Sequence, residues 1–153
     1  MKSLSCPVAV RAWKEPEEVA RFLLETRRTI RVAVESNYPN EWELVGAIIK
    51  ATPDLSSAVI RAFAADGTDD GFLLIPPALE ALRRIGNEGD TRKFVREFSN
   101  SPHEDLRVRV ADALRYLVDG EKSTAADLDL LQQLLVDKSP HVRRVAIRAL
   151  AGC

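Results

Sequence analysis

Apolar residues recur at helical spacing through the C-terminal half of the chain, and the pattern repeats. Three segments each carry apolar residues at i, i+4, i+7 and i+8, which is one stripe along an α-helix. These stripes are Leu74, Ala78, Ala81 and Leu82; Leu106, Val110, Ala113 and Leu114; and Val142, Ala146, Ala149 and Leu150. Another set, Phe94, Val95 and Phe98, recurs as Leu130, Leu131 and Leu134. The pattern predicts repeated helical hairpins, which are typical of α-solenoids.

The N-terminal half shows the same rhythm less regularly. We expect a short helix around Val8 to Lys14, then a helix that begins at Glu15-Pro16 and runs, directly or through a bend, to about Ser36. Two further helices should begin near Asn40 and Pro53. Their expected buried residues are, in chain order, Val19, Phe22, Leu23, Ile30, Ala33, Val34, Leu44, Val45, Ile48, Ile49, Val59, Ile60 and Phe63.

The segment Asp66–Gly71 is rich in Asp and Gly, and we expect it to form the longest loop of the domain. The next helix should begin near Ile75, because Pro76 and Pro77 are tolerated only in a first turn, and it should end at Gly86, a residue suited to a left-handed cap. The remaining predicted helices span 90–99, 102–118, 124–136 and 140–151, the third capped by Ser123 or Thr124. Alanines at 78, 81, 111, 113, 146 and 149 should allow close helix packing.

Composition fits one soluble domain. The 153 residues are 46% hydrophobic and 29% charged, with a net charge of −1, so charge alone indicates no polyanionic partner. The two cysteines, Cys6 and Cys153, form no CxxC motif, which favours free thiols in a reducing cytoplasm. No apolar run reaches the length of a membrane span. We therefore expect a cytoplasmic protein, monomeric and all-α, that forms a single domain over 1–153 with degenerate hairpins at 1–70 and clear repeats at 71–153.

The segment from Asp137 to Leu150 closely resembles the HEAT repeat, especially its bacterial phycobilisome-lyase-like version, and Ala81–Gly86 looks like the end of another unit. The resemblance implies a right-handed α-solenoid of about four hairpins. In that family an Asp and an Arg six residues apart form a hydrogen-bond ladder between stacked repeats. Asp137 and Arg143 match this pair, and the middle repeat keeps Arg107 but has Ser101 in place of the Asp.

Candidate metal sites are incomplete. The sequence D-x-T-x-D-G at 66–71 matches the first half of an EF-hand loop, but Pro77 stands where the bidentate acid belongs, which favours a solvated acidic loop. His103 and His141 each lie beside a proline at a helix start. Among HEAT-like enzymes, the deoxyhypusine hydroxylases carry His-Glu pairs just after the Val-Arg step. The aligned positions here are Arg144-Val145 and Val108-Arg109, so these ligands are absent, and the lone pair His103-Glu104 cannot build an iron site. We expect no metal, no cofactor and no catalytic centre, and lyase activity would follow only by analogy.

Arginine is the one enriched charge, and exposed arginines on the second helix of each hairpin should face the concave side that such arrays use for binding. The candidate partner-binding residues are Arg84, Arg109, Arg115, Arg144 and Arg148, whereas Arg107, Asp137 and Arg143 should form the structural ladder. Interleaved carboxylates favour salt-bridged, solvated faces over a basic stripe.

The sequence therefore predicts a non-enzymatic scaffold or adaptor that binds another protein through its concave face. Small HEAT-like bacterial proteins include adaptors and toxin-neutralising immunity proteins, and the resemblance permits both. The alternative is nucleic-acid binding through the arginine face, as in HEAT-like alkylpurine DNA glycosylases.

Overall fold

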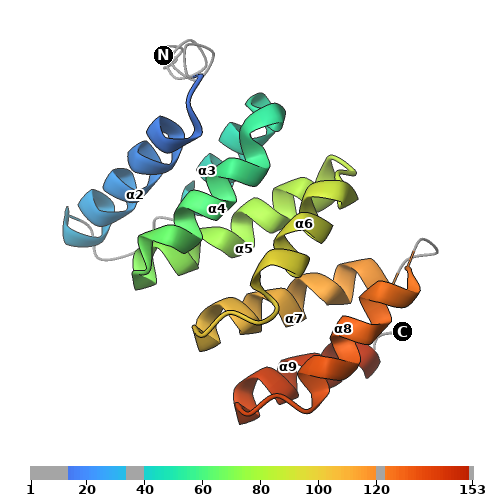
Figure 1. The fold of residues 1–153 in the computed structure, drawn as a ribbon. Helices are drawn as coiled ribbons and strands as arrows, with labels where there is room; N and C mark the ends of the chain where they lie inside the picture. The colour runs from blue at the N-terminus through green and yellow to red at the C-terminus, as the bar shows by residue number, and fades with distance from the viewer. Residues whose placement is uncertain (1–13, 34–39, 120–122, 152–153) are drawn as a thin grey trace. The chain divides into compact units, whose positions relative to one another are not determined.

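The computed structural model describes residues 14–33, 40–119 and 123–151, and all of their regular structure is helical (Figure 1). These residues form α2 (Pro16–Ala33), α3 (Asn40–Ala51), the 3-10 helix η1 (Pro53–Leu55), α4 (Ser56–Asp66), α5 (Asp69–Arg84), α6 (Glu88–Phe98), α7 (Glu104–Val118), α8 (Ala125–Leu135) and α9 (Pro140–Ala151). The predicted all-α class is confirmed for this part of the chain. The predicted helix at 8–14 lies almost wholly outside it.

The chain divides into two compact units, with the boundary between Asn87 and Glu88. The first unit contains α2 to α5, in which α2 packs on α4, α3 packs on α5, and α5 also contacts α4 and α2. Helices α2 and α3 thus each lie against the helix two places later in the chain. Its largest buried side chains are Val19, Leu23, Ile48, Ile49, Ile60, Phe63, Leu74, Ile75 and Leu82.

The prediction that Phe22 is buried was wrong, since its side chain is 37% exposed. The buried stripe of α2 consists of Val19, Ala20, Leu23 and Leu24. At 100° per residue this stripe is centred between Val19 and Ala20, and Phe22 lies about 130° from that centre. Helix α2 itself is continuous, with no break after Arg27-Arg28.

The predicted long loop at 66–71 and the predicted helix start near Ile75 were also wrong. Helix α4 ends at Asp66, Gly67 takes a left-handed conformation (φ 70°), and Thr68 caps α5 by accepting a hydrogen bond from the Gly71 amide at 3.2 Å. The first turn of α5 therefore consists of residues that looked like a loop. Gly86, in contrast, is the predicted left-handed residue after α5 (φ 76°).

Pro76 and Pro77 lie inside α5, where each removes one backbone hydrogen bond. The helix continues through them because the residues on both sides of the prolines are buried. Phe72, Leu74 and Ile75 precede them and Ala78 and Leu79 follow, all buried where α5 packs on α3 and α4. Apolar burial at about 1.5–3 kcal/mol per large side chain outweighs the lost hydrogen bonds.

The second unit contains α6 to α9, in which α7 packs on α6, α8 and α9, and α8 packs on α9. Thr124 begins α8 with a reciprocal capping box to Asp127, as the prediction of a cap at Ser123 or Thr124 required. Helix α7 begins at Glu104 rather than Pro102, because residues 101–103 form a turn in which the His103 amide donates to the Ser101 hydroxyl at 3.1 Å.

The predicted stripes of α7 and α9 are buried with one exception. Leu150 is 47% exposed, although its counterpart Leu114 is fully buried. Helix α7 has neighbours on three sides, whereas α9 packs only on α7 and α8 among the described helices. No described helix is both long and apolar enough to cross a lipid bilayer.

Candidate functional site

A groove of about 510 Å³ lies between α3 and α5 in the first unit. It is lined from α3 by Trp42, Glu43, Gly46, Ala47 and Lys50, and from α5 and the residue after it by Pro77, Glu80, Ala81, Arg84 and Ile85. The lining combines apolar residues with two carboxylates and two basic side chains. This combination is typical of surfaces that bind other molecules.

Helical spacing explains why these residues line one groove. On α3, residues 42, 46 and 50 lie at i, i+4 and i+8, and on α5 residues 77, 81 and 85 repeat the same spacing. Each set therefore forms one edge about two turns, or ~12 Å, long. Trp42 is 50% exposed, and a Cβ added at Gly46 would meet no atom within 4 Å.

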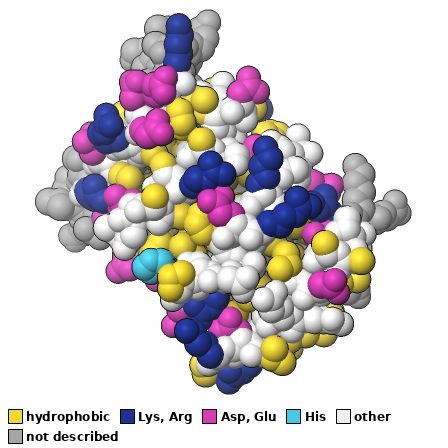
Figure 2. Space-filling model, in the orientation of Figure 1, with side chains coloured by type: hydrophobic (Ala, Val, Ile, Leu, Met, Phe, Trp, Pro, Cys, Tyr) yellow, Lys and Arg dark blue, Asp and Glu magenta, His cyan; other side chains and the backbone are white. Residues whose placement is uncertain are grey.

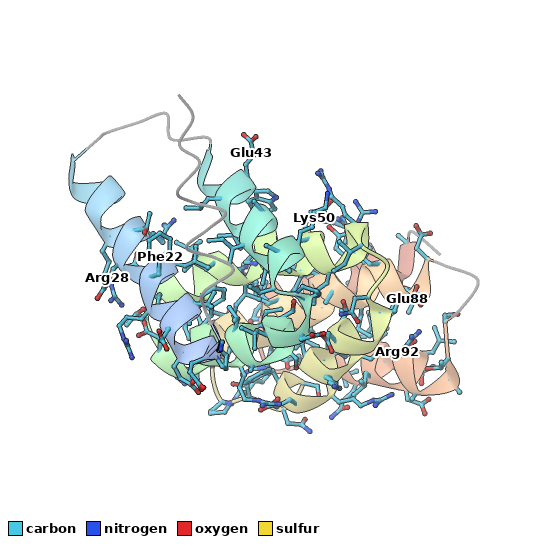
Figure 3. All side chains as sticks on the ribbon, turned by 90° about the horizontal axis from the view of Figure 1, so that it is seen from above. Phe22, Arg28, Glu43, Lys50, Glu88 and Arg92 are labelled. Carbon is cyan, nitrogen blue, oxygen red and sulfur yellow. The ribbon has the colours of Figure 1, made fainter. Side chains whose placement is uncertain are left out.

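Charged groups at the groove are partly paired. Glu80 accepts hydrogen bonds from Arg83 Nη2 at 2.7 Å and from Arg84 Nε at 3.0 Å. The hydrogen bond from Arg83 and the contribution of Arg84 outweigh burial and lower the pKa of Glu80, so this carboxylate is ionised at neutral pH. Glu43 and Lys50 project outward from α3 (Figure 3) and pair with no described residue.

The structure separates the predicted partner-binding arginines. Arg84 lies in the first unit at the groove, while the other four lie in the second unit on α7 and α9. Arg144 and Arg148 are exposed, whereas Arg109 and Arg115 are half-buried. On the visible surface the basic side chains are interleaved with acidic ones (Figure 2), which agrees with the sequence-based expectation of mixed charge.

Arg107 and Asp137 form a buried ion pair between the two hairpins of the second unit. Arg107 Nε and Nη2 donate to the two carboxylate oxygens of Asp137 at 2.9 and 3.2 Å, and its Nη1 donates to the Ser101 carbonyl at 2.8 Å. Arg143 makes the equivalent bond to the backbone carbonyl of Asp137 at 2.7 Å. Ser101 thus supplies a backbone acceptor where an aspartate was expected, and the pairing carboxylate comes from the following hairpin.

Two aspartates of the second unit have lowered pKa values. Burial raises the pKa of Asp137, but hydrogen bonds from Arg107 and from the Ser139 amide outweigh burial, so the pKa falls below its usual value. The pKa of Asp127 is lowered for the same reason. Burial raises this pKa, but the hydrogen bonds from Arg92 and Thr124 lower it by more, and Arg92 Nη2 lies 2.9 Å from the Asp127 carboxylate. Arg92 also lies near Glu88, one turn earlier on α6 (Figure 3).

In the acidic segment at 66–71, the residues from Asp66 to Asp69 are exposed, as expected of a solvated segment, but Asp66 and Asp70 also form ion pairs. Arg27 Nε lies 3.0 Å from Asp70, and Arg28 contacts both Asp66 at 3.1 Å and Asp70 at 3.3 Å. Asp70 is buried, which explains why arginines rather than water neutralise it. The described residues include no cluster of three or more His, Cys, Asp or Glu side chains placed to hold a metal ion.

Sequence reasoning identified Arg84 but missed the rest of the groove. The available signal was the series Trp42, Gly46 and Lys50, which sets an aromatic, a small and a basic residue on one face of a helix otherwise rich in buried Val and Ile. The position of α5 beside this face depends on tertiary packing, so the sequence alone does not indicate a groove there.

Comparison with known proteins adds no relative. No protein-family model matches the chain, and neither curated proteins nor solved structures give a match.

Proposed function

We propose that this protein is a non-enzymatic scaffold or adaptor, built as a HEAT-like solenoid, that binds another protein and uses the α3–α5 groove to do so. The supporting observation is the half-exposed Trp42 in a groove lined by both apolar and charged residues. Binding energy at protein interfaces is concentrated in a few residues, and Trp is the most enriched among them. A half-exposed indole beside a groove is therefore a suitable anchor.

The charges around the groove support a protein partner over a nucleic acid. Two carboxylates, Glu43 and Glu80, alternate with Lys50 and Arg84. A phosphate backbone would be repelled by the former as much as attracted by the latter. A polypeptide can complement both signs.

The proposal is tested by comparing Trp42→Ala with Leu73→Ala. Leu73 is also an exposed apolar residue of the first unit, but it does not line the groove. Proteins bound by the wild-type chain in extracts of its native host are identified, and the affinity of each purified partner is then measured for the three chains. We expect Trp42→Ala to weaken binding by about 30-fold, equivalent to ~2 kcal/mol, and Leu73→Ala to have little effect. Equal affinities for the two variants would overturn the assignment of the groove.

Nucleic-acid binding is the competing function, and it has its own signature. Duplex binding through the arginines would weaken by roughly 0.9 log units per contacted phosphate for each tenfold rise in salt. Micromolar, salt-sensitive DNA or RNA binding that is lost in Arg109→Glu and Arg144→Glu would replace the adaptor proposal.

A further inference from the structure

The two hairpins of the second unit are related by a register of 36 residues, and this relation identifies a second docking surface. Hydrogen bonds repeat at that register. Arg107 and Arg143 each donate Nη1 to the carbonyl six residues earlier, and the amides of His103 and Ser139 each bond to the side chain two residues earlier. Equivalent positions of the two hairpins can therefore be compared directly.

Four side chains of α6–α7 and of the loop between them reach across to α8–α9. Arg92 binds Asp127, Asn100 binds Gln133, Glu104 binds Ser139 and Arg107 binds Asp137. The polar groups of α6–α7 that face α8–α9 are thus hydrogen-bonded by residues of α8–α9 and of the loop between these two helices. Ala111 and Leu114 on α7 are fully buried in the same unit.

The corresponding positions of α8–α9 carry apolar residues that remain exposed among the described residues. Leu128, Val136, Ile147 and Leu150 are equivalent to Arg92, Asn100, Ala111 and Leu114, and their exposed fractions are 41%, 80%, 57% and 47%. They are all of the exposed large hydrophobic residues recorded in the described part of the second unit. A hairpin with no neighbour on its outer side usually has polar residues there, so this face has the composition of a covered one.

Arg143 adds a specific requirement to this face. Its counterpart Arg107 uses Nε and Nη2 to bind the carboxylate of the next hairpin, but Arg143 pairs with no carboxylate of a described residue. Arg144 and Arg148 are exposed on the same helix, and α9 contains no acid. The α8–α9 outer face, defined as Leu128, Val136, Arg143, Ile147 and Leu150, is therefore apolar and basic, which complements an acidic partner.

We infer that the α8–α9 outer face binds a helical hairpin of a partner protein that presents an aspartate or glutamate to Arg143, as Asp137 is presented to Arg107. A second copy of the chain fits less well, because a two-fold contact would place two acid-free α9 helices, each with three arginines, against each other. A nucleic acid would satisfy the arginines but would leave four apolar side chains uncovered. This interface is independent of the α3–α5 groove.

The test supplies the chain with a hairpin of known chemistry. A copy of residues 118–151 is appended directly after Cys153, which keeps the 36-residue register and brings a copied Asp137 toward Arg143. Unfolding of the parent and extended chains is measured with and without Arg143→Ala, and hydrogen exchange of the α9 amides is followed in both.

We expect the appended hairpin to slow exchange in α9, and Arg143→Ala to reduce the docking equilibrium by about 30-fold or more beyond its effect in the parent chain. Arg143→Lys should restore only part of this difference, because an ammonium cannot form the two parallel hydrogen bonds. Changing the copied aspartate to alanine must reproduce the loss, and this variant leaves the parent fold untouched.

Three results would overturn the inference. The first is an equal effect of Arg143→Ala in the parent and extended chains. The second is a parent chain that dimerises at micromolar concentration and becomes monomeric on Ile147→Asp but not on Leu73→Asp, which would assign the face to a second copy. The third is salt-sensitive duplex binding that requires Arg143 but not Ile147.

Discussion

At the scale of single residues, the second unit depends on one buried ion pair. Arg107 is almost fully buried, and both of its carboxylate contacts go to Asp137. A buried charge left without its partner is strongly destabilising, because the lost Coulomb and hydrogen-bond energy no longer offsets desolvation.

Asp137→Ala should therefore lower the free energy of unfolding by about 3–5 kcal/mol, as measured by urea denaturation. Asp129→Ala is the matched control, because Asp129 is an exposed aspartate of α8 with no partner among the described residues. A double variant, Arg107→Met with Asp137→Leu, should recover most of the loss, since it removes both charges. Equal destabilisation by the two alanine variants would show that the pair contributes nothing specific.

The ion pairs of Asp127 and Asp137 make the free energy of unfolding depend on pH in the acid range. The pKa values of Asp127 and Asp137 are lowered in the folded protein from an ordinary value of 3.8. As the pH falls, these two carboxylates therefore bind protons in the unfolded chain before they do so in the folded protein. The stabilisation that they contribute is fully present well above pH 3.8 and is lost as the pH falls toward the lower pKa of the folded state.

We expect the free energy of unfolding to decrease as the pH falls below about 4, and the slope to be smaller in the Arg107→Met, Asp137→Leu variant. Chemical denaturation at a series of pH values checks this. An unchanged slope in the double variant would mean that other carboxylates carry the acid dependence.

At the scale of elements, the α4–α5 corner is set by a close backbone approach at Gly71. A Cβ at this position would lie 2.4 Å from the Phe63 carbonyl oxygen. The first turn of α5 can therefore pack on α4 only if residue 71 has no side chain. Gly46 in α3 is the opposite case, because its added Cβ would meet nothing within 4 Å.

Gly71→Ala should destabilise the protein by about 1–3 kcal/mol, since the backbone has to shift. Gly46→Ala should stabilise it by about 0.5–1 kcal/mol, because alanine restricts the unfolded chain and suits a helix interior. Thermal and urea unfolding of the two variants measure whether each substitution lowers or raises the free energy of unfolding. Destabilisation by both substitutions to the same extent would contradict the close approach.

At the scale of the whole molecule, pairing of an aspartate with an arginine from another helix recurs among the described residues. Asp66 and Asp70 pair with Arg28 and Arg27 across α2, α4 and α5. These ion pairs link three helices of the first unit.

Chelation should leave the melting temperature unchanged, and added Ca²⁺ should not raise it, because Asp66 and Asp70 of the 66–71 segment are already paired with Arg27 and Arg28. Calorimetry with EDTA and with millimolar Ca²⁺ measures this. Arg27→Ala should lower the melting temperature instead, since it leaves buried Asp70 short of a cation. A fall of several degrees with chelator would show that a metal contributes to folding.

The sequence by itself determined the helical class, most helix bounds and the buried positions of the repeats. Periodicity at 3.6 residues, the cap at Thr124 and the left-handed Gly86 are local properties, so Leu106, Val110 and Ala146 were assigned to the core correctly. The resemblance placed Arg107, Asp137 and Arg143 in a structural ladder, but it matched Asp137 with Arg143. In the structure the Asp137 carboxylate pairs with Arg107, and Arg143 binds only the Asp137 backbone carbonyl.

Only the tertiary structure decided where a helix continues against its local sequence preference and which apolar helix faces remain exposed to solvent. Helix α5 extends through Pro76 and Pro77 because burial against α3 and α4 outweighs two lost hydrogen bonds. Leu114 and Leu150 occupy equivalent positions in the pattern, yet one is buried and the other exposed. Periodicity fixes which face of a helix is apolar, but the neighbour that covers that face is set by packing between segments far apart in the chain.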